Sequence, residues 1–190
     1  MVIYMSKRSF GAGTLLAPVP VVLVSCGTFA EPNVMTAAWT GIVCSDPAKT
    51  YVSLRPERFS HELITRTGDF VINLPSASLT RITDMCGVLS GRKINKFEYC
   101  HLTRESCEHV TAPAVGECPV ILECRVSQKL PLGSHDMFIA DILNVSVNED
   151  LIDDNGKIMF DRADLITYSH GEYFRLGEKL GKFGYSVKKR

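Results

Sequence analysis

Apolar and polar side chains alternate with a period of two in two stretches of the chain, residues 120–127 and residues 143–147. Such alternation is typical of a strand with one face on a core and the other face in solvent. Gly133, Ser134 and His135 lie in the connection between the two stretches. The pattern predicts a long antiparallel hairpin, which requires a fold that contains an antiparallel sheet.

Shorter apolar runs predict further strands at residues 19–24, 50–54 and 70–74, because these runs are rich in β-branched or aromatic residues. Residues 25–32 contain glycine and proline, so they predict a turn. Another strand is expected to begin after this turn, at Asn33.

Helical spacing of apolar residues is clearest over residues 79–89, where Ser78 is a candidate N-cap and Gly91 a candidate end. A shorter helix is expected near Ser60, and the polar residues 148–157 predict a loop. Strands therefore dominate and helices are insertions between them. This favours an antiparallel barrel over an alternating parallel βαβ design.

A chain of 190 residues with 45% hydrophobic content can bury a sizeable core without a disulfide or metal, so one domain over residues 1–190 is expected. Its 21 basic and 21 acidic residues balance, which makes nucleic acid an unexpected partner. Pro18 and Pro20 interrupt the apolar run that a signal segment would need. No run reaches the roughly 18 apolar residues of a membrane span, so a soluble cytoplasmic protein is expected.

The chain has seven cysteines, an odd number, and no two of them are spaced as Cys-x-x-Cys. This number and spacing are typical of a protein in a reducing cytosol. The alternative is a metal or iron–sulfur site built from Cys100, Cys107, Cys118 and Cys124. Such sites usually contain closely spaced pairs of cysteines that set the ligand geometry. The four cysteines lack such a pair, which disfavours the metal site.

Two arginines and a serine form a candidate anion site. Arg55 and Arg58 can fork onto phosphate oxygens, and Ser60 is expected near a helix N-terminus, where free N–H groups favour negative charge. Solvated surface arginines and an ordinary serine cap are the alternative interpretation. The chain has no Gly-x-Gly-x-x-Gly or phosphate-binding loop motif, which disfavours a Rossmann or P-loop enzyme.

The stretch Asn33-Val-Met-Thr-Ala-Ala-Trp39 places amide, hydroxyl and small side chains directly after the first strand and its turn. This composition suits a surface for a flat polar ligand. Trp39 is expected in the core because a tryptophan buries a large area, and stacking on an aromatic ring is the alternative.

Several motifs in the same order resemble the flavin reductase-like, FMN-binding split-barrel family and, within it, the flavoredoxin-like branch. The motifs are Asn33–Trp39, Val52–Pro56 with Arg58–Ser60, Phe70–Pro75, Ser90–Lys93 with Lys96-Phe97, Gly133–Ala140, and Tyr173–Gly177 followed by Gly181–Gly184. Most relatives have Asp-Lys-Phe where this chain has Asn95-Lys96-Phe97, so an ion pair that holds Lys96 is not expected here.

The resemblance implies a mainly β fold, a six-stranded antiparallel split β-barrel with inserted helices that forms a homodimer with one FMN at each of two sites. It implies no catalytic nucleophile or base, because a flavin carries its own reactive centre. The residues expected to hold FMN are Asn33, Met35, Thr36, Ala37, Ala38, Ser53, Leu54, Arg55, Arg58, Ser60 and Lys96.

The implied function is FMN-dependent redox chemistry, as a flavin reductase that uses NAD(P)H or as a flavoredoxin that exchanges electrons with a protein. A non-catalytic FMN-binding protein and a cysteine-based metal protein are the alternatives. His61, His101 and His109 are expected on the surface. His135 and His170, near the hairpin and the C-terminal region, are expected at most to modulate a reduced flavin.

Overall fold

The structure, a computed structural model, describes residues 5–187; residues 1–4 and 188–190 of the expected single domain lie outside the described residues. Within these bounds the principal sheet is antiparallel and has seven strands, where six were expected. Their order is β3 (Pro32–Ala37), β2 (Val22–Gly27), β6 (Asp69–Leu74), β9 (Val120–Pro131), β10 (Asp136–Val147), β5 (Ala48–Leu54) and β4 (Thr40–Ser45).

The chain connects the two edges of this sheet directly. β3 and β4 are opposite edge strands, yet only Ala38 and Trp39 lie between them. A flat sheet would separate these edges by about 29 Å, six spacings of about 4.8 Å. The connection spans at most about 11 Å, so the sheet must roll up until its edges meet. The backbone N–H of Ser53 on β5 donates to the carbonyl of Trp39 at 2.9 Å and ties the seam.

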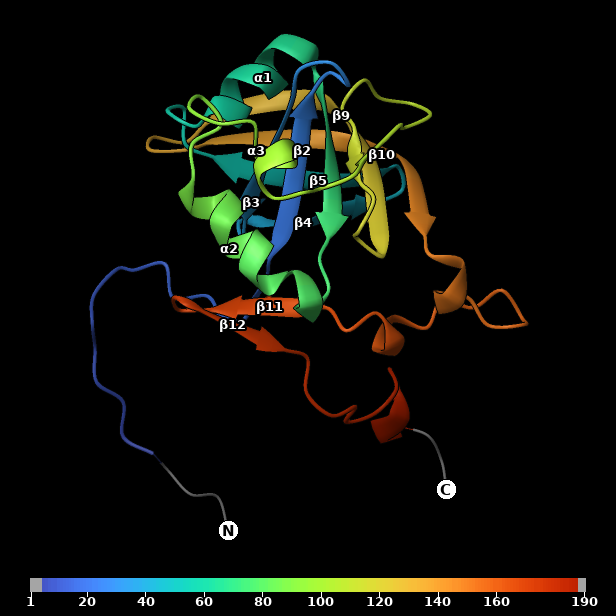
Figure 1. Cartoon of the computed structure of the whole chain (residues 1–190). Helices are drawn as coiled ribbons and strands as arrows, with labels where there is room; N and C mark the ends of the chain where they lie inside the picture. Colours follow the sequence, from blue (N-terminus) through green and yellow to red (C-terminus); the bar gives the residue numbers. More distant parts are fainter. Residues whose placement is uncertain (1–4, 188–190) are drawn as a thin grey trace.

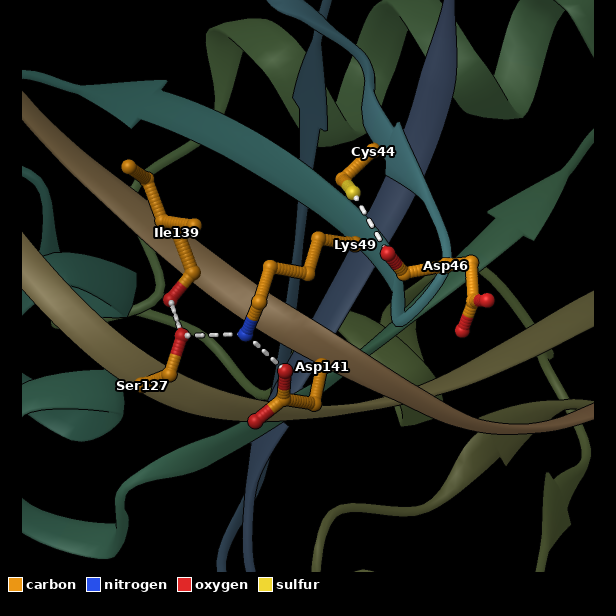
Figure 2. Close-up of polar contacts among 6 residues, drawn as sticks. All are labelled: Cys44, Asp46, Lys49, Ser127, Ile139 and Asp141. Carbon is orange, nitrogen blue, oxygen red and sulfur yellow. Dashed lines mark hydrogen bonds and ion pairs between the residues drawn. The ribbon is translucent and has the colours of Figure 1, made fainter.

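The predicted hairpin is confirmed as β9 and β10, which pair from Asp136 with Pro131 to Val147 with Val120. Its outer face carries a polar contact to β5, drawn in Figure 2. The amine of Lys49 donates to the carboxylate of Asp141 directly opposite and to Ser127 Oγ at 3.4 Å. These contacts join three neighbouring strands on the outside of the barrel.

The helices are short and lie on the barrel surface. α1 (Phe59–Thr67) packs on β2 and β3, α2 (Thr80–Val88) packs on β3, and α3 (Lys96–Tyr99) follows. The short 3-10 turns are η1 (Ala77–Leu79), η2 (Glu149–Leu151), η3 (Phe160–Arg162) and η4 (Tyr185–Val187).

Two predicted helix boundaries are wrong. Ser78 lies inside η1 and exchanges a 2.8 Å hydrogen bond with Ser76, so it does not cap α2, whose N-cap residue is Leu79. Gly91 lies beyond the C-cap residue of α2, Leu89. The predicted turn at residues 25–32 is also too long, because both flanking strands extend into it through backbone pairing.

β2 is buried on both faces, which explains its continuous apolar sequence. Val24 belongs to the barrel interior with Leu63, Phe70 and Phe138. Leu23 faces the opposite way, into a cluster formed with α2 and α3. α2 and α3 thus cover β2 and β3 from outside the barrel, whereas α1 places Leu63 in the interior cluster.

Smaller sheets complete the fold. β1 (Val19–Pro20), β11 (Ile166–Ser169) and β12 (Glu172–Arg175) form one, and β7 (Arg104–Glu105) pairs with β8 (Ala114–Val115). Figure 1 shows β11 and β12 next to α2, while the N-terminal arm extends away from the barrel. No helix in the described part of the chain is long and apolar enough to cross a membrane.

Candidate functional site

Two adjoining cavities lie where the edges of the barrel meet. The first has a volume of about 510 Å³ and the second about 440 Å³. Met35, Arg55 and Arg58 line both, so the two cavities form one continuous groove. Each volume is within the range of small-molecule sites in proteins.

The groove brings together all eleven residues that the sequence singled out. The first cavity is lined by Asn33, Met35, Arg55, Arg58, Ser60 and Lys96. The second is lined by Met35, Thr36, Ala37, Ala38, Ser53, Leu54, Arg55 and Arg58.

β3 forms one wall of the groove. It is an edge strand of the sheet, and its side chains alternate between the barrel side and α2. On the barrel side the side-chain amide of Asn33 donates to Ser60 Oγ at 2.7 Å, and both residues are buried. Towards α2 the hydroxyl of Thr36 donates to the carbonyl of Thr83. The hydroxyl proton of Thr36 is therefore engaged in this hydrogen bond. Towards a ligand, the Thr36 side chain can act only as a hydrogen-bond acceptor.

The turn between β5 and α1 supplies the two arginines. It is closed by a 3.1 Å hydrogen bond from the backbone N–H of Arg58 to the carbonyl of Arg55. Both side chains are largely exposed, and Arg58 also donates to the Gly87 carbonyl at 3.4 Å. Ser60 lies in the first turn of α1 but is not its cap, because the N-cap residue is Arg58.

Lys96 is the buried cation of the site, with only 3% of its surface exposed. Its amine donates to the carbonyl of Cys86 at 2.6 Å. Burial lowers the pKa of Lys96, and the positive charge of Arg58 lowers it further. The preceding Asn95, which departs from the family pattern, caps α3 by accepting from the backbone N–H of Phe97 at 3.1 Å.

Gly91 passes close to the floor of the first cavity. A Cβ at this position would lie 2.0 Å from Oδ1 of Asn33 and 3.1 Å from the ring of Phe59. A side chain here would displace the asparagine that holds Ser60. Glycine is therefore required by the close approach of this loop to β3.

Aromatic side chains surround the second cavity. The rings of Trp39 and His135 stack with centroids 4.5 Å apart, and Tyr168 meets Tyr173 edge-on at 5.6 Å. The expectation that Trp39 lies in the core is wrong, since it is 43% exposed in the short link between the sheet edges. Burial lowers the pKa of His135, with a further contribution from Arg55.

His61 was expected on the surface, and this is also wrong. It is buried against Phe138, and its Nε2 lies 2.8 Å from Oδ2 of Asp136. Lys129 contacts the same oxygen at 3.3 Å. The hydrogen bond from His61 is the main cause that lowers the pKa of Asp136. Helical spacing offered a signal, because His61 and the buried Ile64 are three residues apart on α1.

The structure gives the cysteines no redox partner among the described residues. All seven are free, and no group of three or more potential metal ligands is present in this part of the chain. Burial raises the pKa of Cys26 and of Cys86 to about 12. Thiols with such pKa values remain protonated at neutral pH and are poor nucleophiles.

Comparisons with known proteins agree with this arrangement. The family model described as the flavin reductase like domain matches residues 15–177. An uncharacterized protein of Archaeoglobus fulgidus is 36% identical over 131 residues, which are 69% of this chain and 73% of that protein.

Two solved structures are close in fold. Flavoredoxin of Desulfovibrio vulgaris (Miyazaki F) aligns with a TM-score of 0.90 and 36% identity, over 96% of this chain and 100% of that one. Flavoredoxin from Methanosarcina acetivorans aligns with a TM-score of 0.88 and 26% identity, over 97% of this chain and 100% of that one. The expected split-barrel fold is thereby confirmed.

The contacts of Asp136 with His61 and Lys129 predict a pH dependence of stability. A carboxylate with a lowered pKa contributes stability above its ordinary pKa, and this contribution is lost as the pH falls through the folded-state value. We expect wild type to unfold at a higher temperature than Asp136→Asn at neutral pH, and the difference to shrink below about pH 4. Thermal unfolding over a pH series measures this. The exposed Asp154→Asn is the control, and a difference for Asp136→Asn that does not change with pH would contradict a role of the Asp136 carboxylate in stability.

Proposed function

The chain belongs to the flavin reductase-like domain family, which gives it a flavin-related redox role of the oxidoreductase type, and from this premise we propose that it binds one FMN in the groove at the barrel seam. The observation that carries the proposal is the division of the groove into two chemically different ends. Lys96 lines only the first cavity, Arg55 and Arg58 lie where the two cavities adjoin, and the second cavity gathers small and aromatic side chains.

The cationic end suits a single phosphate group. Arg55 and Arg58 offer guanidinium donors, Lys96 offers an ammonium, and the buried pair of Asn33 and Ser60 adds polar groups. The buried Lys96 has no carboxylate within ion-pair distance in the described part of the chain, so an anionic ligand would complete its surroundings.

The other end suits the flat flavin ring. Ala37 and Ala38 leave room for a planar molecule, and the unpaired edge of β3 offers backbone groups for hydrogen bonding. Trp39 and Tyr168 supply aromatic surface beside it. The cations among the residues that line the two cavities are Arg55, Arg58 and Lys96, and all three line the first cavity. A single cationic end favours FMN, which has one phosphate, over a dinucleotide with further phosphates.

A bound flavin supplies the redox chemistry, and the residues of this chain bind it, orient it and limit its contact with water. The side chains around the ring end also define the face on which an electron donor approaches. NAD(P)H or a reduced protein is the donor class that we propose.

We also propose a homodimer. The N-terminal arm and the C-terminal tail expose large apolar side chains, among them Phe10 (80%), Leu16 (86%), Leu180 (90%) and Phe183 (107%). Large apolar side chains exposed on an extended arm and tail are suited to be covered by another chain. A second copy that packs on the arm would also approach the groove, because Leu16 and Trp39 line a further cavity next to it.

The purified chain should take up close to one FMN per chain. Absorbance of the flavin relative to protein concentration, after added FMN is removed, measures this stoichiometry. Anaerobic addition of NADH or NADPH then tests the redox role, because a bleached flavin shows an oxidoreductase and separates it from a non-catalytic FMN carrier. A colourless protein that does not retain added FMN would contradict the proposed function.

Arg55→Ala should weaken FMN binding by roughly ten- to hundredfold, the equivalent of about 1.5–3 kcal/mol for a charge-assisted hydrogen bond. The unfolding temperature without FMN should barely change, because Arg55 is exposed. Arg162→Ala, an exposed arginine that lines neither cavity, is the matched control and should bind FMN as wild type does. Loss of stability with unchanged FMN affinity would instead give Arg55 a structural role.

Gly91→Ala should weaken FMN binding by about tenfold, the equivalent of about 1.4 kcal/mol, because the new methyl group displaces Asn33 from Ser60. Titration of the apo protein with FMN measures the affinity. Gly177→Ala is the control, because a Cβ at that position meets no atom within 4 Å. Equal affinities for the two variants would show that Asn33 does not shape the phosphate end.

A further inference from the structure

Lys96 is a cation without an anionic partner in the described part of the chain. Its side chain is buried at the cationic end of the groove, where the amine lines the first cavity together with Asn33 and Ser60. The amine donates one hydrogen bond, to the Cys86 carbonyl at the end of α2. An ammonium has three N–H donors, so two remain for a ligand.

The titratable and charged groups that affect the pKa of Lys96 come from several elements around it. Cys86 lies on α2, Cys26 on β2 and Cys100 directly after α3. The pKa values of Cys26 and Cys86 are raised to about 12, so these thiols are neutral. Arg58, from the turn before α1, adds a positive charge.

Two other charged residues line the same cavity, Arg55 and Glu57. Both are exposed to solvent, where water screens their effect on a buried amine. Without an anion in the cavity, burial and the charge of Arg58 therefore act against the ammonium form of Lys96 and lower its pKa. An anion in the cavity reverses this balance, because its charge stabilises the ammonium.

We propose that Lys96 makes the site selective for a phosphate-bearing flavin by taking up a proton when the phosphate enters the cavity. The inference rests on the proposed function, since it requires the phosphate of FMN at this end of the groove. The buried position of the amine, its single carbonyl partner and the adjacent Arg58 carry the argument. A flavin without a phosphate brings no anion to Lys96 and does not raise the pKa of its amine.

Proton uptake links the affinity to pH in a defined direction. Between the pKa of Lys96 in the apo protein and its higher pKa in the complex, the Kd for FMN rises by up to about tenfold per pH unit. Below the apo value the Kd is constant, because Lys96 is then charged in both states. Phosphate ionisation does not contribute above about pH 7, since its second pKa is about 6.

The test uses the full chain, freed of flavin, and FMN as the ligand. Calorimetric titrations from about pH 7 to about pH 9.5, in Hepes and in Tris, give the Kd and the number of protons taken up, because the two buffers release protons with different heats. We expect uptake of up to about one proton per FMN. Riboflavin, the same flavin without the phosphate, should bind more weakly and without proton uptake.

Variants assign the proton to Lys96. Lys96→Arg, which is charged at every accessible pH, and Lys96→Met, which is never charged, should both bind FMN with no proton uptake and with a Kd that does not follow this pH dependence. Arg55→Ala should bind more weakly and keep the proton uptake of wild type. It therefore separates a loss of phosphate affinity from a loss of coupling.

Three results would overturn the proposal. Wild type that binds FMN without proton uptake shows that Lys96 is already charged in the apo protein. Uptake that persists in Lys96→Arg and Lys96→Met assigns the proton to another group. Wild type that binds no FMN at any pH overturns the proposed function itself, and with it the coupling.

Discussion

The two-residue link between opposite sheet edges is the constraint on which the site depends. Ala38 and Trp39 join β3 to β4, so the seven-stranded sheet must close on itself. Closure carries β3 to β5, two strands that are far apart in the order of the sheet. Met35 and Ala37 from one strand and Leu54 from the other then line the same cavity. The groove is thus a direct consequence of the seam.

The seam also determines the charge of the site. The turn that follows β5 carries Arg55 and Arg58 to one end of the groove, and the loop before α3 brings Lys96 to the same end. Lys96 is held by a backbone carbonyl and not by a carboxylate, within the part of the chain that the structure describes. A carboxylate partner would have neutralised the site. The arrangement leaves N–H donors of Lys96 available for a ligand at the expense of a buried amine.

Sequence patterns predicted the elements well where one physical signal dominated. Period-two alternation located β9 and β10, and every residue expected to hold FMN lies on the groove, although their contacts with a ligand remain a proposal. The errors arose where tertiary packing decides. Trp39 is large and apolar, but the closure of the sheet leaves it at the surface on His135. His61 is polar, but α1 turns it inward to Asp136. β11 and β12 had no clear signal, because they have only four residues each, and β1 was predicted as one strand with the start of β2.

The buried His61 links the two ends of the groove. Asp136 accepts from His61 on α1, the helix that also carries Ser60 at the cationic end. The neighbouring residue along the chain, His135, stacks on Trp39 at the aromatic end. The dipeptide His135-Asp136, at the start of β10, therefore contacts α1 at one end of the groove and Trp39 at the other.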